Sequence, residues 1–182
     1  MKIFLLSILF LSCASSQYNA FDKFHESFEK RDFKGIENIL SDHITIESST
    51  SKEKYEKYQY VEDMKNWATV FDTKWIVLSK TEIGDTVYSV EVDSDIFKDY
   101  FYDGGNKVNL KYVEKNDKLI YLSWDMGEDD KNKIYEKRYR AFAEWCYKKY
   151  PYRYFNLQYQ SQRALLEIKF MLENYLKEKT IF

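Results

Sequence analysis

The stretch KVNLKYVEKNDKLIYLSWD, residues 107–125, decides the fold of this chain. Apolar and polar residues alternate on either side of a charged break at 115–118, which is typical of a hairpin made of two long strands. The residues that share the apolar parity are Val108, Leu110, Tyr112, Ile120, Leu122 and Trp124. Together with a strand expected at Thr86–Ser94, this hairpin predicts the centre of a strongly curved antiparallel sheet.

The composition of the chain indicates one globular domain with long regular elements. Its 182 residues are enough for one hydrophobic core, and 45% of them are apolar while 32% are charged. This balance excludes a chain embedded in a membrane and also a disordered one. Five glycines and one proline leave few interruptions of helices and strands. The net charge of −2 removes the general electrostatic reason to bind nucleic acid.

The first 12 residues predict an export signal rather than a part of the fold. Lys2 is followed by an apolar run at 3–11, which is too short to cross a membrane as a helix. The sequence FLSC at 10–13 resembles a bacterial lipobox, in which the cysteine becomes the lipidated first residue of the mature protein. We therefore expect a lipoprotein signal peptide at 1–12, lipidation of Cys13 and a tether at 13–18. The alternative is cleavage after Ala14, which would give a secreted or periplasmic soluble protein.

The mature chain predicts an α+β core at 19–127. Phe21, Phe24 and Phe28 recur at helical spacing and predict an amphipathic first helix. Residues 95–106 fit either a continued strand or an outward bulge. The other expected elements are a helix at 33–40 capped by Asp32, a strand at His43–Ser48, a loop or solvated helix start at 49–56, a helix ending at Phe71, and strands at Trp75–Ile83 and Thr86–Ser94.

A helical extension is expected at 128–182, after a charged break. Pro151 separates two helical stretches, which should pack as a hairpin, and Ser161 is the expected cap of the second helix. Cys146 lies on the aromatic stripe of the helix before Pro151 and is expected to be buried as a small hydrophobic residue. The stripe at Leu165–Leu176 must be buried on the core domain or on a partner protein.

If helices cover the face of the sheet that carries the apolar residues, they enclose aromatic side chains between the helices and the sheet. On the strand at Thr86–Ser94, Tyr88 and Val90 are assigned the inward parity, and Glu91 and Asp93 the outward one. Tyrosine and tryptophan have polar tips that would orient a flat or hydrophobic small molecule. The residues expected to wall such a ligand pocket are Tyr88, Tyr112, Trp124, Val90, Leu110 and Leu122. The alternative is that these side chains only fill the core.

Three helices with one strand inserted, followed by a meander of strands, resemble the nuclear transport factor 2-like superfamily, which includes the SnoaL-like domains. The residues that carry the resemblance are the aromatic first helix, the break at Arg31–Phe33 into Ile36–Leu40, the strand His43–Glu47, the helix ending at Phe71 and the strand ending in Leu122–Asp125. The resemblance implies an α+β fold in which N-terminal helices cover a curved antiparallel sheet, or cone, here with a C-terminal helical hairpin added. Superfamily members use the cone as an enzyme pocket, a binding module or a dimer scaffold, so the fold alone does not give the function.

Enzymes of this superfamily often place an aspartate, or a histidine with an aspartate, inside the pocket as general acid or base. The two histidines of this chain, His25 and His43, are not assigned to the cavity, and no catalytic residue is transferred from the resemblance. The candidates that the sequence offers are His43, Asp93 and Asp125. The sequence contains no metal-ligand spacing, no phosphate-binding glycine loop and no nucleophile motif, so that no metal or cofactor is predicted.

Three hypotheses for the function follow. The first is a non-enzymatic, lipid-anchored protein of the bacterial cell envelope, whose cone binds a small hydrophobic molecule or a protein partner. The second is a small-molecule lyase, isomerase or hydrolase that acts in the cone. The third is a structural module that docks through its C-terminal helices. The membrane is the expected partner of a lipid on Cys13, nucleic acid is not an expected partner, and the oligomeric state stays open.

Overall fold

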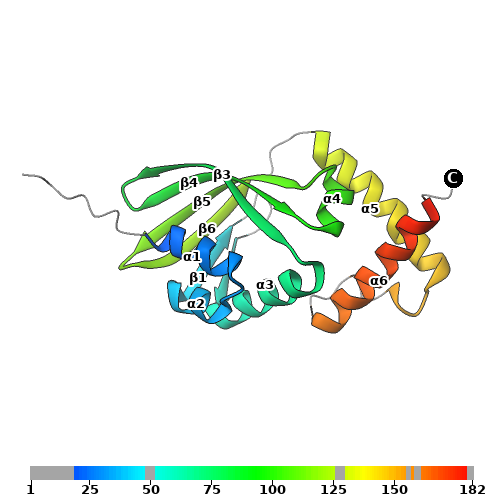
Figure 1. Ribbon diagram of the computed structural model, residues 1–182, viewed down its shortest axis with the longest axis horizontal. Coiled ribbons are helices and arrows are strands. Elements are labelled where there is room, and N and C mark those ends of the chain that lie inside the picture. Colours follow the sequence, from blue (N-terminus) through cyan, green and yellow to red (C-terminus); the bar gives the residue numbers. More distant parts are fainter. Residues whose placement is uncertain (1–18, 48–51, 126–129, 155–156, 158–160, 180–182) are drawn as a thin grey trace, which may run out of the picture.

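The fold is seen in a computed structural model of the chain, which describes residues 19–47, 52–125, 130–154, 157 and 161–179. The predicted signal peptide, the predicted lipidation site Cys13 and the tether lie outside these residues. The described chain forms a curved six-stranded sheet, with helices packed under it and a helical hairpin at one end of the molecule (Figure 1).

Three helices form the layer that lies against the sheet. They are α1 (Ala20–Glu29), α2 (Phe33–Ile39) and α3 (Lys57–Phe71). The predicted aromatic stripe of the first helix is confirmed, since Phe21, Phe24 and Phe28 are all buried. The predicted cap of α2 is confirmed as well, because the Asp32 carboxylate accepts a hydrogen bond from the Gly35 amide at 2.8 Å.

The sheet has the strand order β2-β1-β6-β5-β4-β3. The strands are β1 (Leu40–Glu47), β2 (Lys52–Glu56), β3 (Lys74–Ile83), β4 (Thr86–Ser94), β5 (Asn106–Lys115) and β6 (Lys118–Asp125). Neighbouring strands are antiparallel except for β1, which runs parallel to β6. Strand β2 was expected as a loop or helix start. It forms because its residues pair with the outer edge of β1.

The hairpin predicted at 107–125 is confirmed as β5 and β6. Asn116 and Asp117, both at positive φ (52° and 58°), make a two-residue turn of the kind that suits the twist of a hairpin. The strand β6 carries one extra residue at Ile120, opposite the step from Val113 to Glu114. This bulge shifts the parity, so the prediction for Ile120 was wrong: Leu119 is fully buried in its place, and Ile120 is only partly buried.

The parity assigned to β4 was also wrong. Val87, Ser89 and Glu91 face the helices, whereas Tyr88 is 44% exposed on the outer face of the sheet. The pairing fixes this orientation, because Glu91 lies opposite the buried Val108 in β5. The prediction assumed that the apolar side of the strand faces the helices. It fails here because the buried carboxylate of Glu91 accepts hydrogen bonds inside the fold, and these remove most of the cost of its burial.

The ambiguous stretch after β4 is a short helix, α4 (Ile96–Tyr102). Asp95 caps it by accepting a hydrogen bond from the Lys98 amide at 2.9 Å. The helix ends at Asp103, Gly104 and Gly105, which all have positive φ and lead into β5. The strands β4 and β5, which pair in the sheet, are therefore connected through the helix α4, and this helix lies beside the cone.

The C-terminal helices are α5 (Asp130–Lys149) and α6 (Gln162–Lys179), and they pack on α3 and α4 (Figure 1). They share a second core with these elements: Val70, Phe71, Phe101, Phe142, Cys146, Leu165, Ile168, Met171, Leu172 and Tyr175. Ser161 caps α6 as predicted, since its hydroxyl accepts from the Ala164 amide at 3.4 Å. The stripe that begins at Leu165 is therefore buried against the same chain. None of the described helices combines the length and hydrophobicity needed to cross a membrane.

Candidate functional site

A cavity of about 290 Å³ lies between α3 and the sheet, and we call it the cone pocket. Six of its thirteen described lining residues are aromatic: Phe28, Tyr55, Tyr60, Trp67, Trp75 and Trp124. The polar side chains of the lining are Asp63, Thr73, Asp93 and Lys98. Ligand sites in proteins typically begin at about 300 Å³ and are mostly apolar with a few polar groups. The cone pocket therefore has the size and lining of a site for a small, largely apolar molecule.

A buried carboxylate, that of Asp95, fixes one side of the cone pocket. One of its oxygens accepts hydrogen bonds from Trp67 Nε1 at 3.1 Å and from Thr73 Oγ1 at 2.7 Å. The other oxygen accepts the amide of Lys98 at the start of α4. A single side chain thereby holds α3, the turn after it and α4 together, which orients the Trp67 ring in the pocket wall.

Asp93 and Lys98 form an ion pair on the same side of the pocket. The ammonium of Lys98 also lies 5.4 Å from the centre of the Trp67 ring, within the range of a cation–π contact. Burial raises the pKa of Asp93 above its ordinary value, although the Lys98 ammonium opposes this shift. A carboxyl group of this kind exchanges its proton closer to neutral pH than an exposed one.

Two buried polar atoms beside the cone pocket have no hydrogen-bond partner among the described residues: Trp75 Nε1, a donor, and Asp93 Oδ1, an acceptor. Their residues are direct neighbours across β3 and β4. A buried polar group without a partner costs about 1–3 kcal/mol. Both atoms are enclosed by the protein, so neither is exposed on the surface of the pocket.

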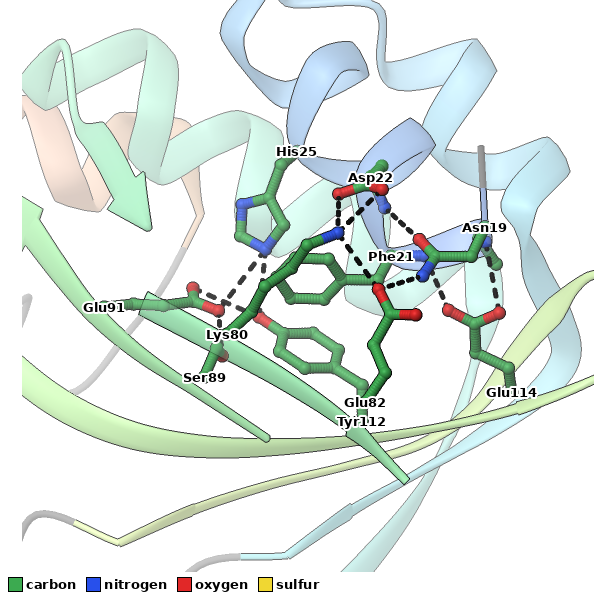
Figure 2. Close-up of polar contacts among 11 residues, drawn as sticks. Asn19, Phe21, Asp22, His25, Lys80, Glu82, Ser89, Glu91, Tyr112 and Glu114 are labelled. Carbon is green, nitrogen blue, oxygen red and sulfur yellow. Dashed lines mark hydrogen bonds and ion pairs between the residues drawn. The ribbon is translucent and has the colours of Figure 1, made fainter. Parts of the chain in front are cut away.

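A second polar cluster lies under α1 and joins it to β4 and β5 (Figure 2). Its centre is Glu91, which is fully buried. The carboxylate accepts hydrogen bonds from the Tyr112 hydroxyl at 3.2 Å and from the Ser89 hydroxyl, and lies 3.4 Å from Nε2 of His25. Burial, and then the charge of Glu91, raise the pKa of Tyr112 well above its ordinary value, so the phenol stays a donor.

Tyr60 on α3 relates this cluster to the cone pocket. It belongs to the pocket wall, and burial raises its pKa, with the charge of Glu91 adding to the shift. The members of the cluster itself do not belong to the pocket lining. The Glu91 cluster is therefore a buried support of the fold, and the raised pKa keeps the phenol of Tyr60 neutral.

Polar contacts hold the start of α1 on the strands β3 and β5, next to Tyr112 (Figure 2). Lys80 pairs with Asp22 at 2.6 Å. The carboxylate of Glu114 accepts the first amides of the helix, those of Ala20 at 3.2 Å and Phe21 at 2.9 Å. An anion at a helix N-terminus also interacts favourably with the helix dipole. These contacts fix α1 on the sheet and so fix Phe28 in the wall of the cone pocket.

The structure places one of the six expected pocket residues, Trp124, in the wall of the cone pocket. Leu110, Tyr112 and Leu122 do face the helices, but they are packed in the main core instead of lining the cavity. Tyr88 and Val90 lie on the outer face because the parity of β4 is reversed. The pocket is consequently displaced from the centre of the hairpin toward α3.

The three candidate catalytic residues lie far apart in the fold. His43 is half exposed on the outer side of β1 and contacts Glu56, with Nδ1 2.8 Å from the carboxylate. Asp125 is exposed at the end of β6. Asp93 alone belongs to the cone pocket, contrary to the outward parity expected for it. Cys146 is a buried free thiol, and burial raises its pKa to about 12.

Sequence reasoning missed three of the α3 residues that line the cone pocket, namely Tyr60, Asp63 and Trp67. The stripe that the spacing predicted for this helix was Tyr58, Val61, Met64, Ala68 and Phe71. Of these, Met64 and Ala68 lie in the pocket wall, whereas Tyr58 is 61% exposed. Tyr60 and Trp67 lie at i−4 and i+3 from Met64, so the sequence carried a signal for a second apolar stripe through Met64. Trp75 was not identifiable, because its position depends on the pairing of β3 with β4.

Comparisons with known proteins give structural likeness only. No protein-family model matches the chain, and a comparison with curated protein sequences finds no match. A structure of an LEH-like epoxide hydrolase of M. tuberculosis is similar with a TM-score of 0.52 and 12% identity, over 67% of this chain and 90% of that chain. A putative ketosteroid isomerase from Kribbella flavida is similar with a TM-score of 0.50 and 10% identity, over 60% and 76% of the two chains.

A protein of unknown function from Cytophaga hutchinsonii, described as nuclear transport factor 2-like, has a TM-score of 0.48 and 14% identity, over 60% of this chain and 91% of that chain. At 10–12% identity, the likeness to the epoxide hydrolase and to the isomerase shows the fold alone and leaves the chemistry open. The chain has the α+β cone fold of the nuclear transport factor 2-like proteins, with additional C-terminal helices.

Proposed function

We propose that the protein binds a small, largely apolar molecule in the cone pocket and that binding, not catalysis, is its function. The observation that carries this proposal is the aromatic cavity itself, which is open enough for a ligand and is not filled by the core residues Tyr112 and Leu110. The polar side chains of the lining, Asp63, Thr73, Asp93 and Lys98, supply donors and acceptors for a polar group of a ligand.

Binding is expected to be visible through tryptophan fluorescence. Trp67, Trp75 and Trp124 line the cone pocket, so a bound neutral aromatic of the size of benzyl alcohol should change their emission saturably. Titration with a panel of such compounds measures this directly. The proposal is wrong if no compound of this size gives a saturable signal up to its solubility limit.

A second candidate function is acid–base catalysis on a small molecule, as in the second hypothesis. The observation that favours it is Asp93, a buried carboxyl in the cavity wall with a raised pKa. Chemical conversion of a bound compound, detected by mass spectrometry and lost in Asp93→Asn, would favour an enzyme over a binding protein. Retained binding without conversion favours the first proposal.

The proposed place of action is the bacterial cell envelope, with a lipid on Cys13 as the membrane anchor. The support is the lipobox-like sequence FLSC at 10–13, after a short apolar run. We expect Cys13→Ala to leave the membrane fraction and to lack the mass of the lipid. The lipid anchor is disproved if this variant stays in the membrane fraction and carries the same attached mass as the protein with Cys13.

A further inference from the structure

We propose that the ligand of the cone pocket is a small organic cation, a quaternary ammonium or a protonated amine. This inference rests on the proposed binding function and adds the chemical class of the ligand. It joins two features of the same cavity, namely aromatic ring faces and an excess of carboxylates.

The aromatic wall suits a cation because ring faces carry partial negative charge. Three of the six rings that line the cone pocket are indoles, which attract cations most strongly. The pocket already uses one of them in this way, since the Lys98 ammonium lies 5.4 Å from the centre of the Trp67 ring. Among the described lysines and arginines, none lies over the rings of Tyr60, Trp75 or Trp124.

The charges around the cone pocket are unbalanced toward the negative side. Asp63 and Asp93 belong to its lining, and Asp95 lies directly behind Trp67 and Thr73. Among the described residues of the lining, Lys98 is the single cation, and it is paired with Asp93. These groups favour a cationic ligand and disfavour a carboxylate or a phosphate.

Asp63 is the carboxylate that remains for a ligand. Within the described part of the chain it has no cationic partner, and its neighbour Glu62 is another acid. Asp63 is partly buried in the pocket wall, and this burial raises its pKa. A cation that enters the pocket would compensate this charge, and the aromatic wall would replace part of the water that the cation leaves behind.

The inference is tested with three ligands of nearly the same shape and different charge. Choline is positive, 3,3-dimethylbutan-1-ol is its neutral isostere, and 3,3-dimethylbutanoate is negative. We expect choline to bind about tenfold more tightly than the neutral alcohol, and the carboxylate to bind most weakly. Isothermal titration calorimetry and tryptophan fluorescence measure the three affinities.

The variant Asp63→Asn keeps the shape of the side chain and removes its charge. We expect it to lose most of the preference for choline while the affinity for the neutral alcohol stays the same. The matched control is Glu62→Gln, which removes the charge of the adjacent residue on the exposed face of α3 and should leave both affinities unchanged.

Acid provides an independent check, because the charge of choline does not change with pH. The charged groups around the ligand are Asp63 on α3, Asp93 on β4, and Asp95 and Lys98 at α4, while the phenols of Tyr55 and Tyr60 stay neutral in acid. Burial holds the pKa values of Asp63 and Asp93 above the ordinary 3.8. Choline affinity should therefore fall as the pH drops through these raised values, and the affinity of the neutral alcohol should not.

The outcomes separate the two proposals. If the neutral alcohol or the carboxylate binds as tightly as choline, the cation inference is overturned and the binding function stands. If benzyl alcohol binds and choline does not, the cation inference is likewise overturned and the proposed binding function stands. If neither choline nor any neutral aromatic binds, both the inference and the proposed function are wrong.

Discussion

Replacing Tyr112 with alanine is expected to lower the free energy of unfolding by about 3–5 kcal/mol, the range for truncating a large buried aromatic side chain. Tyr112 is fully buried, and its ring packs edge-on against Phe21 with the ring centres 4.9 Å apart. It also contacts the rings of Phe24 and His25. The substitution opens a cavity between α1 and the hairpin and removes a donor from Glu91. Urea denaturation of the two proteins measures the difference.

The variant Tyr112→Phe separates packing from hydrogen bonding. It keeps the ring and removes only the hydroxyl that donates to Glu91 at 3.2 Å, so a smaller loss of about 1–3 kcal/mol is expected. A loss for alanine that is no larger than the loss for phenylalanine would show that the ring is not a main packing element of the core.

The variant Ala68→Phe is expected to abolish ligand binding to the cone pocket. Ala68 lies on α3, is 2% exposed and belongs to the pocket lining, so that an added ring occupies the space of the ligand. Overpacking of this kind costs about 1–3 kcal/mol of stability, and circular dichroism checks that the variant folds. Met64→Trp fills the same cavity from a partly exposed position and serves if Ala68→Phe does not fold.

The control for this experiment is Ala141→Phe, the same substitution on the exposed face of α5, away from the cone pocket. It should bind the neutral aromatic and choline with unchanged affinity. Equal affinity in Ala68→Phe and in Ala141→Phe would place the ligand elsewhere on the molecule.

The sequence allowed the elements with strong local patterns to be predicted. The hairpin of β5 and β6 follows from the alternation of apolar and polar residues around a two-residue turn, although the bulge at Ile120 interrupts it. The helix α1 follows from three phenylalanines at helical spacing. The helix α4 has a weaker signal, since Ile96–Tyr102 is short and rich in aromatic residues that suit a strand equally well. Its formation depends on Asp95 as a cap and on the second core that Phe101 enters.

The candidate site was less accessible to sequence reasoning, because it depends on pairing and not on pattern. Val90 and Val92 predict that their side of β4 faces the helices, but the opposite side, which carries Glu91, does so. The hydroxyls of Ser89 and Tyr112 donate hydrogen bonds to Glu91 and so offset the cost of burying its carboxylate. The same reversal brings Asp93 into the cone pocket beside Trp75. Only Trp124 was both predicted and found in the wall, since it lies on the strand whose parity past the bulge was read correctly.

The central claim, that the cone pocket is the ligand site, is tested most directly by a crystal structure of the protein soaked with 4-bromobenzyl alcohol. The anomalous signal of bromine locates the compound without interpretation of its shape. We predict a bromine position inside the cavity between α3 and the sheet, enclosed by the rings of Trp67, Trp75 and Trp124. Bromine found only on the outer surface, or an empty cavity at saturating concentration of the compound, would contradict the account.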